Sequence, residues 1–452
     1  MCSSDLLFGT DGVRGVANSE LTCELALKIG RAAAYVLTDS GNRHPKILIG
    51  KDTRISSDML EASITAGLCS VGADVVQLGV IPTPAVAYLV GKYKADAGVM
   101  LTASHNPCQF NGIKIFSGDG YKLPDALEDE IEDIILHNAE KLPVPVGGDI
   151  GTVTTAPNAV RDYVNHIKST VPFSLDGLRI GIDCANGAAS STAEVLFTEL
   201  GAQCCMISNH PNGVNVNDNC GSTHMENLMA FVRENGLDAG VAFDGDADRC
   251  LAVDDKGNLV DGDFVMAICS ADMKSRGKLA KDTAVGTIMT NMGFSRFCEA
   301  NGMHFEATKV GDRYVLEKMQ QEGYNFGGEQ SGHVIFLDFA TTGDGQLTAA
   351  QLLSILKRRQ AKLSSLATLM TRFPQVLINV EVAADGKQRF AGDETVQKAV
   401  EAAKQKLGND GRIIVRPSGT EPLLRVMVEG LDKELIHELA ENVAEVLKER
   451  LA

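Results

Sequence analysis

The α/β character of the chain is clearest in the stretch KILIG, residues 46–50, where three consecutive isoleucine or leucine side chains follow Lys46. A short apolar run of this kind predicts a buried strand. Amphipathic patterns predict helices over about 20–38 and 57–71, and further apolar runs predict strands over 73–78 and 97–101. Short strands that alternate with longer helices are typical of α/β layering.

The same alternation begins again twice along the chain. The second round contains strands over 178–183 and 239–243 with a helix over about 188–200. The third contains a strand over 283–287 and a helix over about 292–301. The chain after about residue 371 has a different pattern, which predicts strands over 376–383, 412–415 and 424–429 and a helix over 433–450.

These patterns predict an α/β protein with three similar mixed α/β domains and a smaller C-terminal α+β domain. A link rich in proline and glycine near 142–151 marks the first boundary. The expected domains cover residues 1–150, 151–256, 257–370 and 371–452.

Composition restricts the class of protein. The chain has 452 residues, of which 44% are hydrophobic and 22% charged, so several buried cores are expected. The formal charge of −17 argues against a nucleic-acid partner. No apolar run reaches the roughly 18 to 20 residues of a membrane span, and no secretory signal is expected. The 11 cysteines form no C-x-x-C pair, which favours a reducing, cytoplasmic location.

The strongest chemical signal is DGDADR, residues 244–249. Its carboxylates, Asp244, Asp246 and Asp248, alternate and therefore project to one side of an extended chain. Crowding them is unfavourable unless a cation neutralises them, and carboxylate oxygens suit Mg²⁺. An EF-hand is excluded because Arg249 replaces the required glycine and the flanks are predicted strands. A solvated acidic turn is the remaining alternative.

The stretch LTASHNP, residues 101–107, follows a predicted strand and ends in a turn. Ser104 is therefore expected at the carboxyl end of a strand, where α/β sheets bind their ligands. It lacks the G-x-S-x-G setting of an acyl-transfer nucleophile, and an ordinary polar turn is the alternative. Lys114 offers a cation within reach of the same turn.

Two further polar stretches could hold a ligand. In RPSGTEP, residues 416–422, a guanidinium, two hydroxyls and a glycine could cradle a phosphate, with Arg425 nearby on the next strand. In GGEQSGH, residues 327–333, Glu329 and Ser331 alternate and could face one ligand. Each stretch alone is equally compatible with an ordinary loop. No dinucleotide-binding fingerprint competes with them.

Together and in this order, the four stretches resemble the α-D-phosphohexomutase superfamily over essentially the whole chain. The resemblance implies four domains around one central cleft, with the last domain closing over it. It also implies that Ser104 is phosphorylated and binds Mg²⁺ together with Asp244, Asp246 and Asp248. Glu329 and Ser331 would hold sugar hydroxyls. The non-transferring phosphate would be bound by Arg416, Ser418, Gly419, Thr420 and Arg425.

Within the superfamily, the stretches FGTDGVRG (8–15) and VGDRYV (310–315), together with Gln330, are similar to the branch that acts on glucosamine phosphates. Lys51 departs from the usual arginine but keeps its charge. The implied reaction interconverts glucosamine 6-phosphate and glucosamine 1-phosphate, feeding UDP-N-acetylglucosamine synthesis. It would pass through glucosamine 1,6-bisphosphate, and that compound or a related hexose bisphosphate would be the activator. The family also suggests a homodimer.

Further roles follow from this mechanism as hypotheses. Arg249 and Lys114 would add positive charge, and Lys114 or His105 would transfer the proton of the sugar hydroxyl. Arg14 would approach the phosphoserine, and His333 would lie on the sugar side. Three alternatives remain open: the same chemistry on glucose or mannose phosphates, a sugar-phosphate phosphatase, and a catalytically silent sugar-phosphate sensor.

Overall fold

The computed structural model describes residues 7–9, 12–38, 44–383, 385–418 and 423–452. The chain divides into two compact units. The first contains residues 1–290 and 298–369 and carries three sheets; the second contains residues 291–297 and 370–452 and carries one.

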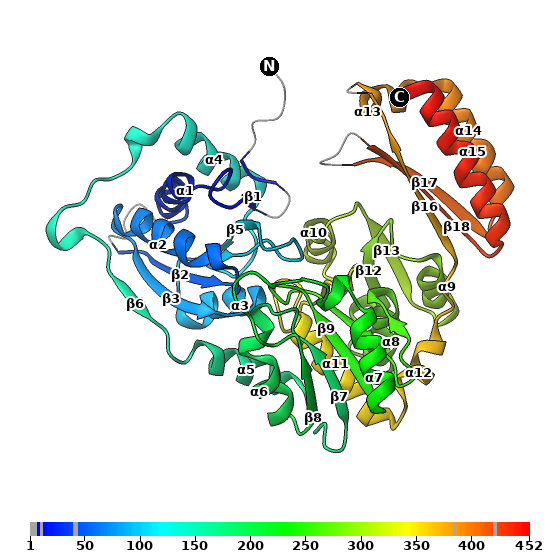
Figure 1. Ribbon diagram of the computed structural model, residues 1–452, viewed down its shortest axis with the longest axis horizontal. Coiled ribbons are helices and arrows are strands. Elements are labelled where there is room, and N and C mark those ends of the chain that lie inside the picture. Colours follow the sequence, from blue (N-terminus) through cyan, green and yellow to red (C-terminus); the bar gives the residue numbers. More distant parts are fainter. Residues whose placement is uncertain (1–6, 10–11, 39–43, 384, 419–422) are drawn as a thin grey trace. The chain divides into compact units, whose positions relative to one another are not determined.

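The first sheet lies in the blue and cyan part of the ribbon in Figure 1. It has six strands in the order β1-β5-β4-β2-β3-β6. Strand β2 pairs parallel with both β3 and β4, so the carboxyl ends of these three strands lie at one edge. The strands are β1 (Val13–Val16), β2 (Lys46–Lys51), β3 (Asp74–Val80), β4 (Ala97–Leu101), β5 (Phe110–Ser117) and β6 (Val153–Thr155).

Helices cover both faces of this sheet. One hydrophobic core joins α1 (Cys23–Val36), α2 (Ile55–Cys69) and α4 (Asp125–Leu136) to alternate strand residues such as Ile47 and Val99. Helix α3 (Thr83–Tyr93) lies on the opposite face, because a side chain at Gly50 or Gly98 would meet Val86. The alternation of the strand side chains thus supplies two cores.

The second sheet has the order β11-β10-β9-β7-β8 and the third the order β13-β12-β14-β15. The second-sheet strands are β7 (Arg179–Asp183), β8 (Gln203–Ile207), β9 (Ala239–Phe243), β10 (Cys250–Val253) and β11 (Leu259–Val260). The helices along this stretch are α5 (Ala159–Thr170), α6 (Ala193–Glu199) and α7 (Glu226–Asn235). The third-sheet strands are β12 (Thr283–Thr287), β13 (His304–Thr308), β14 (Phe326–Gly328) and β15 (Val334–Phe336). The accompanying helices are α8 (Gly262–Ser275), α9 (Met292–Ala300), α10 (Asp312–Glu322), α11 (Gly345–Arg359) and α12 (Leu363–Leu366).

The second unit has a three-stranded antiparallel sheet in the order β16-β18-β17. One hydrophobic core joins the sheet to α14 and α15. Its elements are β16 (Gln375–Glu381), β17 (Gly411–Pro417), β18 (Leu423–Gly430), α13 (Gly386–Arg389), α14 (Glu394–Leu407) and α15 (Lys433–Leu451).

The predicted α/β class and the strands quoted above are confirmed. The expected helix over 188–200 is partly wrong, because residues 188–191 form a 3₁₀ turn and the helix begins at Ala193. Thr192, with a φ of −132°, separates the two pieces. Strand β6 begins after residue 150 and nevertheless pairs with β3, so the first sheet extends beyond the expected boundary.

Among the described helices, none combines the length and the apolar character that crossing a membrane would require. Each of the ten cysteines in the described part of the chain is a free thiol.

Candidate active site

Ser104 lies in the turn that follows β4, at the edge where β2, β3 and β4 end. Its side chain is fully buried, and its backbone is left-handed with a φ of +51°. The N–H of Ser104 donates to Oγ1 of Thr102 at 2.9 Å. A serine in this conformation is strained, and such strain persists only where surrounding contacts hold it.

The acidic loop 244–249 joins β9 to the antiparallel β10, so strands flank it as the sequence predicts. Asp244, Asp246 and Asp248 are all buried. One carboxylate oxygen from each lies within 4.8 Å of the others. The hydroxyl of Ser104 donates to Oδ2 of Asp244 at 2.6 Å, so the structure brings the serine turn and the acidic loop together.

The donor set fits a hard divalent cation. Burial raises the pKa of Asp244 well above its usual value, and the neighbouring Asp248 and Asp246 carboxylates raise it further. Oδ1 of Asp246 is buried and has no hydrogen-bond partner among the described residues. Three crowded carboxylates with an unused oxygen are the arrangement that a bound Mg²⁺ would stabilise.

Cationic side chains surround this cluster. Nζ of Lys114, on β5, donates to Oδ2 of Asp246 at 2.8 Å and to Oδ2 of Asp248 at 3.2 Å. Nε of Arg249 lies 3.9 Å from Oδ1 of Asp248. The structure therefore places both predicted cations beside the three aspartates.

His105 is the third polar group at the serine, with Nδ1 3.4 Å from Oγ of Ser104. Burial, together with the charges of Arg249 and Arg14, lowers the pKa of His105 to about 4. The imidazole is therefore neutral at neutral pH and can accept a proton. The charge of Arg14, on β1, therefore acts on the His105 imidazole.

The loop after β14 lies beside the acidic loop. The N–H of Cys250 donates to the carbonyl oxygen of Gly332 at 3.0 Å. Oε1 of Glu329 accepts from the N–H of Gly311 at 3.2 Å, and the charge of Glu329 also acts on Arg249. Oγ of Ser331 is buried and has no partner among the described residues, so it can accept or donate a hydrogen bond to a ligand.

His333 is 3% exposed, and its Nε2 accepts from the N–H of Gly343 at 2.9 Å. A Cβ at Gly343 would lie 2.0 Å from the imidazole. The turn before α11 therefore fixes this ring, and Nε2 is already used as an acceptor.

Two predicted phosphate ligands face each other in the second unit. Arg416 on β17 pairs directly with Arg425 on β18. Burial lowers the pKa of Arg416, and the charge of Arg425 lowers it further. Like charges at paired positions destabilise a sheet, so an anion between them would be stabilising. Ser418 comes directly after β17 and is buried, while Gly419 and Thr420 lie outside the described residues.

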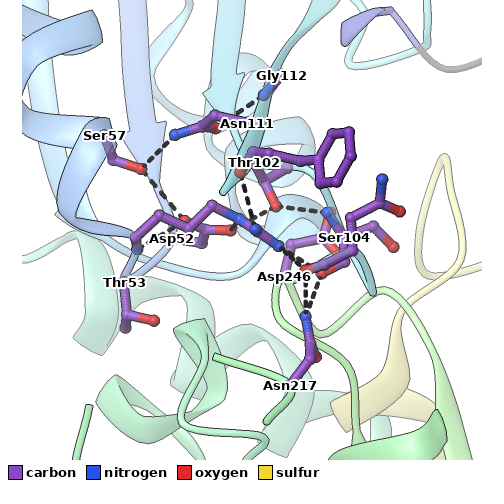
Figure 2. Close-up of polar contacts among 12 residues, drawn as sticks. Asp52, Thr53, Ser57, Thr102, Ser104, Asn111, Gly112, Asn217 and Asp246 are labelled. Atoms are coloured by element: carbon purple, nitrogen blue, oxygen red, sulfur yellow. Dashed lines mark hydrogen bonds and ion pairs between the residues drawn. The ribbon is translucent and has the colours of Figure 1, made fainter. Parts of the chain in front are cut away.

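Sequence reasoning missed several residues that hold the site. Oγ1 of Thr83 donates to Oδ2 of Asp246 at 2.6 Å. Arg54 donates to the carbonyl oxygen of Ser104 and to Asp52. Asp52 and Asn217 lie on either side of the Ser104 turn in Figure 2. Asp52 and Arg54 follow β2 and Thr83 follows β3, so the rule that located Ser104 after β4 would also have found them. Asn217 lies in an irregular loop and gave no such signal.

Four protein-family models match the chain. They are described as the alpha/beta/alpha domains I, II and III and the C-terminal domain of phosphoglucomutase/phosphomannomutase. They match residues 5–142, 161–257, 261–373 and 377–446, respectively.

Individual relatives agree with these matches. A phosphoglucosamine mutase of Acetivibrio thermocellus is 55% identical over 445 residues, which cover 98% of this chain and 99% of that protein. A phosphoglucomutase/phosphomannomutase family protein of Burkholderia thailandensis has a similar structure, with a TM-score of 0.85 at 23% identity over 100% of this chain and 99% of that one. The N-acetylphosphoglucosamine mutase of Aspergillus fumigatus, solved with GlcNAc-6P and magnesium, gives a TM-score of 0.68 at 16% identity and covers 99% of this chain and 96% of that one. At these identities the two structures show the fold alone.

Proposed function

Because the chain belongs to the phosphoglucomutase/phosphomannomutase family, we propose that it interconverts glucosamine 6-phosphate and glucosamine 1-phosphate. The choice of sugar is supported by the 55% identity to a phosphoglucosamine mutase along nearly the whole chain. One observation supports Ser104 as the phosphoryl carrier: its hydroxyl donates to Asp244 within a buried cluster of three aspartates.

The metal in this proposal is Mg²⁺, held by Asp244, Asp246, Asp248 and the phosphorylated Ser104. When bound, the ion supplies positive charge that stabilises the transferring phosphoryl oxygens. The magnesium in the A. fumigatus structure supports this choice of metal.

Phosphoryl transfer from phospho-Ser104 breaks the bond between phosphorus and Oγ and forms a bond between phosphorus and the free sugar hydroxyl oxygen. His105 or Lys114 takes the proton of that hydroxyl. His105 is the uncharged candidate for this role, and its Nδ1 lies 3.4 Å from Oγ of Ser104. Lys114 forms ion pairs with the carboxylates of Asp246 and Asp248, which suits a role in charge stabilisation. Arg14 and Arg249 stabilise the phosphoryl charge.

The remaining contacts orient the sugar. Glu329 and Ser331 bind sugar hydroxyls, and His333 belongs to the same loop on the sugar side of the site. The non-transferring phosphate binds to Arg416, Ser418, Gly419, Thr420 and Arg425. The bisphosphate intermediate must present each phosphate to Ser104 in turn. Added glucosamine 1,6-bisphosphate or a related hexose bisphosphate acts as the activator because it transfers one phosphoryl group to an unphosphorylated Ser104 and leaves as the monophosphate.

We place this reaction in the cytoplasm, in keeping with the free thiols of the described cysteines. The partner is a small hexosamine phosphate, and the protein is proposed to form a homodimer.

The test is an assay of the pure protein with Mg²⁺, catalytic bisphosphate and, in parallel, glucosamine, glucose and mannose 6-phosphates. The proposal expects the highest kcat/KM for the glucosamine compound. A higher value for glucose or mannose phosphate would contradict the sugar assignment. Release of inorganic phosphate without an isomerised sugar would indicate a phosphatase, and absence of both phosphorylation and turnover would indicate a sensor.

A further inference from the structure

Arg54 is a buried guanidinium that grips the turn containing Ser104. It is 2% exposed and is the residue immediately before α2. Its Nη2 donates to the carbonyl oxygens of Ser104 at 3.0 Å and Asn106 at 2.7 Å. Its Nη1 donates to the carbonyl oxygens of Pro107 at 2.6 Å and Phe110 at 2.9 Å.

The fifth N–H of Arg54, on Nε, donates to Oδ2 of Asp52 at 2.8 Å. All five donors of the guanidinium are thereby used, four of them on carbonyl oxygens of the segment 104–110. The same Asp52 oxygen accepts from Oγ1 of Thr102 at 2.7 Å, and this hydroxyl accepts from the N–H of Ser104. The peptide groups on both sides of Ser104 are therefore fixed by one connected network (Figure 2).

Asn217, in a loop that connects elements of the second sheet, donates to two of the same carbonyl oxygens, those of Ser104 and Asn106. Its Nδ2 donates to the carbonyl oxygens of Ser104 at 2.8 Å and Asn106 at 3.1 Å. Asn217 is 7% exposed, and its own N–H donates to the carbonyl oxygen of Ala185 at 2.9 Å. The acidic loop also belongs to the second sheet, so Asn217 links the backbone of the serine to the part of the fold that carries the aspartates.

We propose that Arg54 and Asn217 are positioning residues for phosphoryl transfer, which hold Ser104 in its left-handed conformation so that Oγ stays aimed at Asp244. This inference rests on the proposed function. It adds a reason for the strained backbone: the serine must return to one position after each of two transfers, and donors to its own carbonyl oxygen define that position. A displacement of about 1 Å at a reacting group can cost about 100-fold in rate.

The test compares Asn217→Gly with Asn219→Gly in the full-length protein. Both asparagines belong to the same loop and have a positive φ, which glycine accepts, but Asn219 is exposed and its Nδ2 donates to the neighbouring Asp218. For Asn217→Gly we expect kcat to fall about 10- to 100-fold, with the KM for glucosamine 6-phosphate, the Mg²⁺ affinity and the Tm changed little. Asn219→Gly is expected to keep kcat within about two-fold of wild type.

A second variant, Arg54→Lys, keeps the charge beside Asp52 but has three donors in place of five. It is expected to lower kcat and, because buried carbonyl groups lose partners, also the Tm. Equal kcat values for Asn217→Gly and Asn219→Gly would overturn the inference even if Arg54→Lys fails to fold. The inference would also be overturned if a weaker Mg²⁺ affinity or a higher KM of Asn217→Gly accounted for its whole loss of activity. A wild-type protein that isomerises no sugar phosphate would overturn the proposed function itself.

Discussion

The hydroxyl of Ser104 lies 2.6 Å from Oδ2 of Asp244, although the two residues are 140 positions apart in the sequence. Ser104 follows β4 of the first sheet, and Asp244 follows β9 of the second. The carboxyl ends of strands from two different sheets thus meet at one point. This contact joins the predicted phosphoryl carrier to the predicted metal ligands, and the proposed mechanism depends on it.

Removal of one metal ligand is expected to abolish turnover. Asp246→Asn keeps the shape of a side chain whose Oδ1 is unpartnered among the described residues but removes its charge. We expect kcat/KM to fall about 1,000-fold or more and the Mg²⁺ concentration for half-maximal activity to rise. Asp218→Asn, an exposed acid of the same unit, is the control. Chelation should inactivate the wild-type protein reversibly, and full activity in excess chelator would contradict the metal assignment.

Gly245 is expected to tolerate no side chain, because a Cβ there would lie 2.5 Å from the carbonyl oxygen of Ser104. Gly245→Ala should therefore displace the serine turn or the acidic loop and lower kcat at least about ten-fold. Gly91→Ala is the matched control, since nothing lies within 4 Å of a Cβ at that helical position. Steady-state kinetics and thermal melts of both variants test this, and equal kcat values would show that the close approach has no functional consequence.

Arg416→Gln should weaken substrate binding, because the paired guanidinium groups of Arg416 and Arg425 are proposed to hold the non-transferring phosphate. A charged hydrogen bond of about 1.5–3 kcal/mol corresponds to a KM increase of roughly 10- to 100-fold. Lys398→Gln, on the exposed side of α14, controls for the loss of one positive charge. Unchanged KM values for both variants would remove Arg416 from the phosphate site.

Stability should depend on pH through Asp344, the residue that precedes α11 and accepts from the hydroxyl of Tyr163 at 2.8 Å. Burial raises the pKa of Asp344 from 3.8 to about 7. The folded protein therefore binds this proton more tightly than the unfolded chain, so the stabilisation is complete below pH 4 and is lost as the pH rises through 7. Asp344→Asn should have a Tm that falls less than the wild-type Tm between pH 5 and pH 8.

Asp255→Asn is the control for this comparison. Partial burial raises the pKa of Asp255, but hydrogen bonds from Ser364 outweigh it and leave the pKa below its usual value. Asp255 is then ionised in both states above pH 5, so the Tm difference between this variant and wild type should stay constant. Identical pH profiles for Asp344→Asn and wild type would show that Asp344 does not bind its proton more tightly in the folded state.

Much of the fold and family could be predicted from the sequence, because short apolar runs define buried strands and the four polar stretches carry the family pattern. The family resemblance is confirmed by the matching family models and by the identity to phosphoglucosamine mutases. The contact of Ser104 with Asp244 was an expectation of the resemblance, since no local pattern relates residues so far apart.

The supporting contacts were harder to foresee. The Nδ2 of Asn217 donates to the carbonyl oxygen of Ser104, and no residue pattern in the sequence indicates which carbonyl group an asparagine will contact. Arg54 lies three residues after Lys51, yet its five hydrogen bonds become apparent only when the turn after β4 folds over it. The predicted helix over 188–200 shows the same limit, because the non-helical Thr192 separates a 3₁₀ turn over Ala188–Ser191 from the helix that begins at Ala193.

The most direct test of the mechanism is to locate the phosphoryl group after incubation with radiolabelled glucosamine 1,6-bisphosphate. Label is expected to enter the peptide containing Ser104 and to pass from it to glucosamine phosphate. Ser104→Ala, folded with an unchanged Tm, is expected to take up no label and to retain almost no mutase activity. Label on another residue, or substantial turnover by the Ser104→Ala protein, would contradict the account.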